Sequence, residues 1–308
     1  MAQPQMGVQL YTALQAHKDL HGQELLGAYK LLLAACGRLY QGVEVCDGLL
    51  PYALSRRSDK GAQKLGEVLD ANNLVVLATH FGDARALSNA STFRNSVDFY
   101  QALGCETIVH AYGNPTNQLG GVSGQTEVRK DAFDAFVGQL VRVKDRLAQE
   151  GIKLAYHNHH NEVFLQSDGK PVLDRILEAG IGVEMDTLWI AAGGLDPAQY
   201  LADHAGRIPI IHAKQGTFTG EGWGLKTTFL EAGEEGAVDF GKVIAAARAD
   251  PVVGWILAEQ DTNFRYNPVA SIVQSGLALT ALLNPSGGLA ERVGAAHADL
   301  KAPGQGLQ

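Results

Sequence analysis

Residues 130–162 read KDAFDAFVGQLVRVKDRLAQEGIKLAYHNHHNE, and this stretch predicts a helix followed at once by a strand. Over residues 130–149 the apolar side chains fall mainly along one face of a helix. Gly151 then stands where glycine commonly ends a helix, and the apolar run 153–158 begins two residues later. Such a short connection from a helix to a buried strand is typical of a parallel βα unit.

The same arrangement recurs along the chain, with Gly104 and Gly180 standing just before further apolar runs. Eight short runs bounded by turn signals are candidate strands, and helical patterns lie between them. They are residues 8–11, 43–46, 74–80, 107–111, 153–158, 182–186, 208–213 and 255–260. Eight alternating units predict the α/β class and a (β/α)8 TIM barrel rather than an open doubly wound sheet. No glycine-rich phosphate motif follows a candidate strand, which argues against a nucleotide-binding fold.

The length of 308 residues fits one barrel domain, which we place at residues 1–284. Residues 285–308 lack a core-forming pattern, so we expect a C-terminal tail that is flexible or packed on a neighbour. Residues 113–127 and 215–236 follow the fourth and seventh candidate strands. In a barrel, loops that follow strands lie on the catalytic face, and we expect these two segments to be such loops.

Charge and composition narrow the class of protein. A net charge of −8 argues against a broad nucleic-acid-binding surface, which needs clustered lysine and arginine. Cys36, Cys46 and Cys105 are too few for a disulfide framework and odd in number, which suggests a reducing compartment. The amino terminus lacks the pattern of a signal peptide, and no apolar run approaches the roughly 20 residues that span a bilayer. We therefore expect a cytoplasmic protein with neither a nucleic-acid nor a membrane partner.

Polar side chains concentrate where the candidate strands end, and barrel enzymes carry their catalytic groups at these ends. They are Glu44, His80, His110, His157, His159, Glu184, Asp186, His212, Lys214, Glu259 and Asp261. Any one of them alone fits a structural role equally well, and Asp186 in particular is placed to cap the next helix. Their convergence on one edge of the barrel favours a metal centre. Carboxylates with an imidazole favour Mn²⁺, Mg²⁺ or Co²⁺, although such ligands also suit catalytic zinc.

At these residues the sequence resembles the sugar phosphate isomerase/epimerase superfamily, the xylose-isomerase-like barrels. Residues 151–162 are similar to the YHNHxxEF segment of one large subgroup. Residues 183–189 resemble the ExDxxW strand, residues 206–214 the GRI...HxK segment, and residues 258–262 the closing EQD. The resemblance covers most of the chain and its four segments occur in the family's order. One departure is Gln215, which stands where the HxKD pattern has an acid.

The resemblance implies one bound divalent metal ion, for which Mn²⁺ is our first choice and Mg²⁺, Co²⁺ or Zn²⁺ are alternatives. Asp186, His212 and Glu259 match three of the family's metal ligands. The fourth comes from the strand-five motif. Glu162 preserves a carboxylate ligand and is our first choice, whereas His157 lies nearer to the position of the epimerases' ligand glutamate.

The resemblance also implies a reaction. The metal binds a carbonyl and an adjacent hydroxyl, and a base removes the proton on the neighbouring carbon to give an enediolate. Return of the proton makes a sugar isomerase or epimerase, which is our main prediction. Loss of a β-substituent makes an inosose-type dehydratase or a deglycosidase acting on a 3-keto-glycoside, which is the alternative. The candidate catalytic groups are His159, His157, Glu259 and Glu162, and the candidate substrate contacts are Glu44, His80, Trp189 and Lys214.

Two other functions fit the fold less well. An endonuclease IV-like nuclease would need several zinc ions and a basic surface, and the acidic balance argues against it. A barrel that only binds a sugar is disfavoured because Asp186, His212 and Glu259 are all present. We expect a small sugar as the partner and, by analogy with the family, a homo-oligomer. A deglycosidase would also be associated with a small partner subunit.

Overall fold

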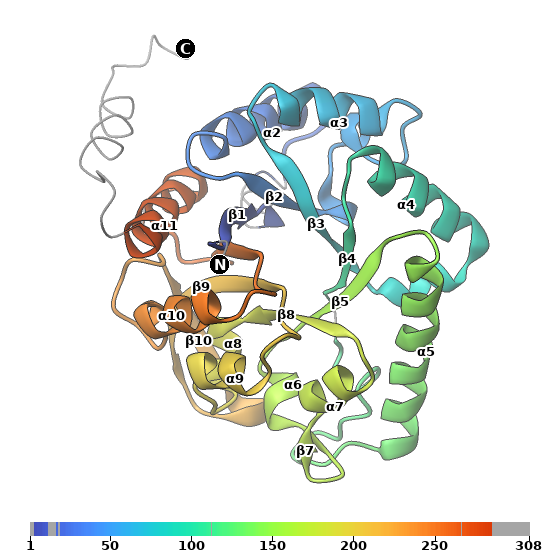
Figure 1. Cartoon of the computed structure of the whole chain (residues 1–308), viewed down its shortest axis with the longest axis vertical. Helices are drawn as coiled ribbons and strands as arrows, with labels where there is room; N and C mark the ends of the chain where they lie inside the picture. The colour runs from blue at the N-terminus through green and yellow to red at the C-terminus, as the bar shows by residue number, and fades with distance from the viewer. Residues whose placement is uncertain (1–2, 12–16, 18, 112, 266, 285–308) are drawn as a thin grey trace.

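The computed structural model describes residues 3–11, 17, 19–111, 113–265 and 267–284, and within them eight parallel strands close into a barrel (Figure 1). In order around the barrel they are β1 (Gln5–Gln9), β2 (Gly42–Cys46), β3 (Val75–Gly82), β4 (Thr107–His110), β5 (Lys153–His157), β8 (Gly182–Asp186), β9 (Ile210–Thr219) and β11 (Trp255–Glu259). The ring closes because β8 pairs with β9 and β11 pairs with β1, both in parallel. This confirms the predicted (β/α)8 barrel.

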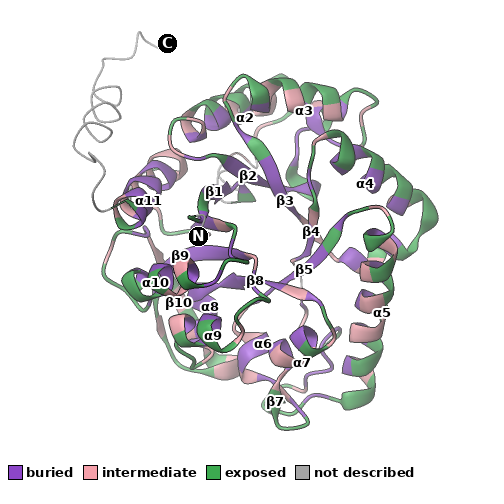
Figure 2. Cartoon of the chain, viewed as in Figure 1, coloured by how far each residue is buried: buried purple, intermediate pink, exposed green. Residues whose placement is uncertain are grey.

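Helices surround the barrel, and Figure 2 shows their outer faces exposed and the strands largely buried. They are α2 (Gly22–Cys36), α3 (Gly61–Asp70), α4 (Ala90–Ala102), α5 (Lys130–Ala148), α6 (Asn161–Phe164), α7 (Val172–Glu178), α8 (Thr187–Ala192), α9 (Pro197–Asp203), α10 (Phe240–Ala249) and α11 (Pro268–Leu283). Short 3-10 turns are η1 (Asp47–Leu49), η2 (Tyr52–Leu54), η3 (Ala84–Ser88) and η4 (Gly222–Gly224). In α5 the predicted apolar stripe is buried at Phe133, Phe136, Leu140, Val143 and Leu147.

Two short hairpins were not predicted. β9 is longer than the run 208–213, and its far end pairs in antiparallel fashion with β10 (Lys226–Leu230), inside the segment expected to be a loop. The other joins β6 (Gln166–Ser167) to β7 (Lys170–Pro171). Its turn residues Asp168 and Gly169 both have positive φ, as a tight two-residue turn requires. β1 also begins and ends earlier than predicted, at Gln5 and Gln9. Its polar Gln9 is buried and donates a hydrogen bond to Glu44.

The barrel interior is packed rather than open. Leu77, Val109, Ile210 and Leu257 belong to a buried cluster against which Trp255 packs. Gly7 allows this packing, because a β-carbon there would lie 2.5 Å from the Leu77 side chain. A larger cluster fills the space between the strands and the surrounding helices. Because side chains fill the barrel interior, we expect the active site at the carboxyl end of the strands.

Three further predictions concern the C-terminal tail, membrane-spanning segments and the cysteines. The predicted tail 285–308 lies outside the described residues. Among the residues that are described, no helix is both long and apolar enough to cross a membrane. The three cysteines are free and buried, as small apolar side chains are.

Replacing Gly276 with alanine is expected to lower the free energy of unfolding by about 1–3 kcal/mol, the usual cost of overpacking. Gly276 lies in α11 where Tyr40 donates a hydrogen bond to the carbonyl of Ile272 at 2.6 Å. A β-carbon at position 276 would lie 2.6 Å from the same hydroxyl oxygen. Urea denaturation followed by circular dichroism measures the change.

The matched control is Gly27→Ala in α2, where an added β-carbon has no atom within 4 Å. Because alanine favours helix more than glycine does, this variant should gain roughly 0.5–1 kcal/mol. Equal stability of the two variants would contradict the packing of α11 on Tyr40.

Candidate metal centre

The predicted ligands meet at the carboxyl end of the barrel. Two overlapping groups each bring ligand atoms within 4.8 Å of one another. The first group is His157, Asp186, His212 and Glu259, and the second is His80, His157, Glu184 and His212. The strands explain this convergence, because residues two apart on a strand face the same way, as Glu184 and Asp186 do on β8.

The first group contains three of the four ligands that the sequence predicts, Asp186, His212 and Glu259. His212 Nδ1 lies 2.6 Å from Glu259 Oε2, and His157 Nε2 lies 3.9 Å from Asp186 Oδ2. Asp186 also caps α8, because its Oδ1 accepts a hydrogen bond from the backbone N–H of Trp189 at 3.1 Å. Its Oδ2 remains directed at the group, so the capping and ligand interpretations both apply to this residue. Two imidazole nitrogens and two carboxylate oxygens form a donor set that fits a divalent first-row ion.

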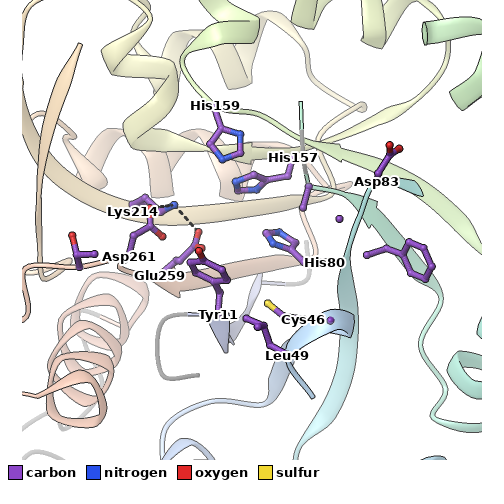
Figure 3. A pocket seen from close by; sticks show the side chains of 15 residues that line it. Tyr11, Cys46, Leu49, His80, Asp83, His157, His159, Lys214, Glu259 and Asp261 are labelled. Carbon is purple, nitrogen blue, oxygen red and sulfur yellow. Dashed lines mark hydrogen bonds and ion pairs between the residues drawn. The ribbon is translucent and has the colours of Figure 1, made fainter. Parts of the chain in front are cut away.

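Lys214 places a cation among the same carboxylates. Its Nζ lies 3.0 Å from Asp186 Oδ2, 3.0 Å from Glu259 Oε2 and 3.2 Å from Asp261 Oδ2. Burial alone would lower the pKa of the ammonium, but the carboxylates of Asp186, Asp261 and Glu259 outweigh it and raise that pKa well above its ordinary value. Figure 3 shows the side chain reaching toward Glu259 across the mouth of the site.

Two further carboxylates face the histidines from within the barrel. Glu184 Oε2 lies 2.8 Å from His80 Nε2, 3.1 Å from His157 Nδ1 and 3.1 Å from His212 Nε2. Glu44 Oε2 lies 2.9 Å from His212 Nε2 and accepts a hydrogen bond from the Gln9 side chain at 2.6 Å. Both glutamates are 0% exposed. The sequence named each as a strand-end residue but gave no sign of these contacts, because they join side chains from six different strands.

Glu162 is not where the sequence placed it. Its carboxylate accepts hydrogen bonds from the Tyr156 hydroxyl and from the backbone N–H of His159, both at 2.8 Å, and it belongs to neither group. The reason is local: β5 ends at His157 and Glu162 lies in α6, so its side chain returns to Tyr156. Burial raises its pKa to about 7. His157, the alternative that the sequence left open for the strand-five ligand, belongs to both groups instead.

A cavity of about 610 Å³ opens beside the metal-type ligands. Its lining includes the polar residues His80, His157, His159, Lys214, Glu259 and Asp261, several of which Figure 3 labels, and the residues Tyr11, Leu49 and Phe81. Of the predicted substrate contacts, His80 and Lys214 therefore face the cavity. Glu44 and Trp189 do not line it. Glu44 is held inside the barrel by Gln9, and Trp189 packs behind His159 with ring centroids 5.8 Å apart.

His159 lies beside the ligands without belonging to either group. Its ring centroid is 5.1 Å from that of His157, and the side chain borders the cavity (Figure 3). Burial, together with the neighbouring His157 and Lys214, lowers its pKa well below the ordinary value, so the imidazole is neutral. A neutral imidazole at a cavity wall can accept a proton.

Two residues discussed from the sequence have structural roles. His110 is buried, accepts a hydrogen bond from the backbone N–H of Ala84 at 3.1 Å and stacks on Tyr156. Gln215, which replaces the family's acid, binds the backbone N–H and carbonyl of Val238, both at 3.0 Å. The amide therefore fastens the end of the segment that follows β10 rather than contacting the cavity.

The chain is similar in sequence to two known proteins. The rhizopine catabolism protein MocC of Rhizobium meliloti is 27% identical over 158 residues, covering 46% of this chain and 47% of that protein. An inosose dehydratase of Geobacillus thermodenitrificans is 26% identical over 197 residues, covering 56% of this chain and 63% of that enzyme. The matches therefore span only about half to somewhat under two thirds of these relatives.

The solved structure of an IolI protein with a bound zinc atom has the same fold, with a TM-score of 0.66, 16% identity and coverage of 92% of this chain and 99% of that one. The family model described as xylose isomerase-like TIM barrel matches residues 31–280. That match extends over most of the chain and includes every residue of the metal-type groups. The chain belongs to the xylose isomerase-like TIM barrel family.

Proposed function

We propose that this chain is a divalent-metal-dependent enzyme that removes a proton from the carbon beside the carbonyl of a keto-sugar or cyclic keto-polyol. The observation that carries the proposal is one arrangement: His157, Asp186, His212 and Glu259 bring four ligand atoms within 4.8 Å, beside a cavity that His159 and Lys214 also line. Two carboxylates in the first group balance the charge of a divalent ion. The cavity is large enough for a small polyol or glycoside.

The residues that would hold the ion are His157, Asp186, His212 and Glu259. His157 replaces Glu162, our first choice from the sequence, as the ligand from the strand-five motif. Mn²⁺ remains our first choice, and the zinc in the IolI structure supports Zn²⁺ as an alternative. When bound, a divalent ion supplies Lewis-acid polarisation of a carbonyl, which acidifies the neighbouring C–H.

His159 is the proposed base. Its side chain lies at the cavity wall, next to the ligands but outside their groups, so its lone pair is available to a substrate C–H. Glu162 accepts a hydrogen bond from the backbone N–H of His159 at 2.8 Å and thereby fixes the position of this residue. The role of Glu162 in this proposal is to position the base.

Lys214 is the proposed acid, and its pairing with His159 favours elimination. His159 is a neutral imidazole and Lys214 a charged ammonium, so the first has a lone pair that can accept a proton and the second has a proton to donate. In β-elimination the C–H proton passes to His159, a C=C bond forms beside the carbonyl, and the C–O bond breaks. The departing oxygen takes a proton from Lys214. An epimerase working in both directions at one carbon needs two groups of matched basicity instead.

A sugar isomerase or epimerase is the second candidate. It is favoured by Glu259, a carboxylate that borders the cavity together with His159 and so offers a second group able to return a proton. Under this alternative Lys214 binds a substrate oxygen.

The test is incubation of the metal-loaded chain in D2O with keto-cyclitols, keto-sugars and 3-keto-glycosides, followed by NMR. Elimination predicts an α,β-unsaturated ketone with released water or alcohol, formed only when metal is present. Deuterium beside the carbonyl without an unsaturated product would favour the isomerase or epimerase. Neither product nor deuterium with any member of the panel would contradict the proposed function.

A further inference from the structure

Each of the two histidines of the first group has carboxylates at both ring nitrogens. In His157, Nε2 faces Asp186 at 3.9 Å while Nδ1 faces Glu184 at 3.1 Å. In His212, Nδ1 faces Glu259 at 2.6 Å while Nε2 faces Glu44 at 2.9 Å and Glu184 at 3.1 Å. One nitrogen of each ring thus points to a carboxylate of the first group, and the other points to a carboxylate buried inside the barrel.

A neutral imidazole carries a single N–H, so one nitrogen donates a hydrogen bond and the other offers a lone pair. A metal ligand must offer the lone pair. The N–H of a metal-ligating histidine is commonly held by a carboxylate, which fixes the tautomer and the orientation of the ring. Glu184 and Glu44 are in position to do this for His157 and His212.

The contacts of the two buried carboxylates are in line with that assignment. Glu184 Oε2 lies 3.1 Å from His157 Nδ1, 2.8 Å from His80 Nε2 and 3.1 Å from His212 Nε2. Glu44 Oε2 lies 2.9 Å from His212 Nε2 and accepts a hydrogen bond from the Gln9 side chain at 2.6 Å. His157 Nδ1 and His212 Nε2 are thus each within hydrogen-bonding distance of a carboxylate oxygen that can accept an N–H.

We propose that Glu184 and Glu44 are positioning residues that set the tautomers of the two ligand histidines. His157 then presents Nε2 and His212 presents Nδ1 to the ion, while the opposite nitrogens donate to the buried carboxylates. This inference rests on the metal-dependent function proposed above. It also says why two acidic residues that do not line the cavity are buried next to the site.

The second ligand group is the competing explanation, since Glu184 would itself bind the ion there. Charge favours the first group, in which Asp186 and Glu259 together balance a divalent ion, whereas the second contains a single carboxylate.

The experiment uses Glu184→Gln and Glu44→Gln in the full chain. Zn²⁺ affinity is measured by competition with a chromophoric chelator, and histidine tautomers are read from ¹⁵N NMR of the Zn²⁺-loaded, ¹⁵N-histidine-labelled protein. We expect each variant to bind Zn²⁺ roughly 10–100-fold more weakly, as loss of such a partner usually does. Glu184→Gln should disturb the ¹⁵N pattern of His157, and Glu44→Gln that of His212. Glu184→Asp, which keeps the carboxylate and its charge, should recover part of the affinity that Glu184→Gln loses.

Glu106→Gln is the control. Glu106 is exposed, and its carboxylate lies near Lys153 rather than near either ligand group. Unchanged affinity and unchanged tautomers in both test variants would overturn the proposal. Loss of binding in Glu184→Gln as complete as in Asp186→Asn would also overturn it, because Glu184 would then be a ligand. If the unaltered chain bound no divalent ion, the proposed function would fail instead, and the tautomers of the metal-free protein would still decide the hydrogen-bond assignment.

Discussion

Replacing Asp186 with asparagine is expected to weaken divalent metal binding well beyond the roughly 10–100-fold that loss of an outer partner costs, and to abolish turnover. The substitution removes the negative charge that faces His157 and Lys214 while keeping the size of the side chain. Asparagine is as good an N-cap as aspartate, so the hydrogen bond to the backbone of Trp189 persists and α8 remains intact. The variant therefore separates the two roles of this residue.

Isothermal titration with Mn²⁺ or Zn²⁺ measures the binding, and product formation in the NMR assay measures turnover. The matched control is Asp196→Asn, an exposed cap whose carboxylate accepts from the backbone of Ala198 and Gln199 at 2.8 and 3.0 Å in front of α9. It makes the same chemical change at a helix start remote from the ligand groups and should bind metal normally. Normal metal binding by Asp186→Asn would leave Asp186 as a helix cap alone.

Replacing His159 with glutamine is expected to lower kcat about 10²–10⁴-fold, the usual contribution of a general base. Metal affinity should not change, because His159 belongs to neither ligand group. The backbone hydrogen bond from position 159 to Glu162 is independent of the side chain and should survive. Loss of proton abstraction with intact metal binding is the expected signature.

His160→Gln is the control for this variant. His160 is adjacent in sequence and also packs near Trp189, with ring centroids 5.6 Å apart, but it does not line the cavity. Comparison of kcat and of deuterium uptake in the two variants isolates the chemistry of the cavity-facing ring. A His159→Gln variant with unaltered kcat would move the base to another group, and Glu259 would be the next to test.

Much of the fold was accessible from the sequence because each unit carries its own local signals. Glycine at the end of a helix, followed closely by an apolar run, identified the strands β4, β5 and β8 to within a residue or two. The β9–β10 hairpin was missed for a physical reason. Its outer part is half exposed and stable only through pairing with its partner strand, so it lacks the continuous apolar run of a barrel strand.

The site was predictable where a residue lies on a strand and less so beyond it. Asp186, His212 and Glu259 lie within barrel strands, so the period of two fixes the direction of each side chain. Glu162 lies past the end of β5, where the direction of the side chain depends on how the chain turns into α6. The contacts of Glu184 and Glu44 depend on spacing between strands, which one sequence does not reveal.

The position of Lys214 bears on whether the ion binds before or after the protein folds. Its ammonium contacts the same Asp186 and Glu259 oxygens that face the proposed ion, so these charges have a counter-ion built into the chain. The apolar core that holds the barrel together lies elsewhere. Small zinc domains fold only when their ion arrives. This barrel, in contrast, is expected to fold first and acquire its ion afterwards, so the relative abundance of metals around the finished protein would decide which one it carries.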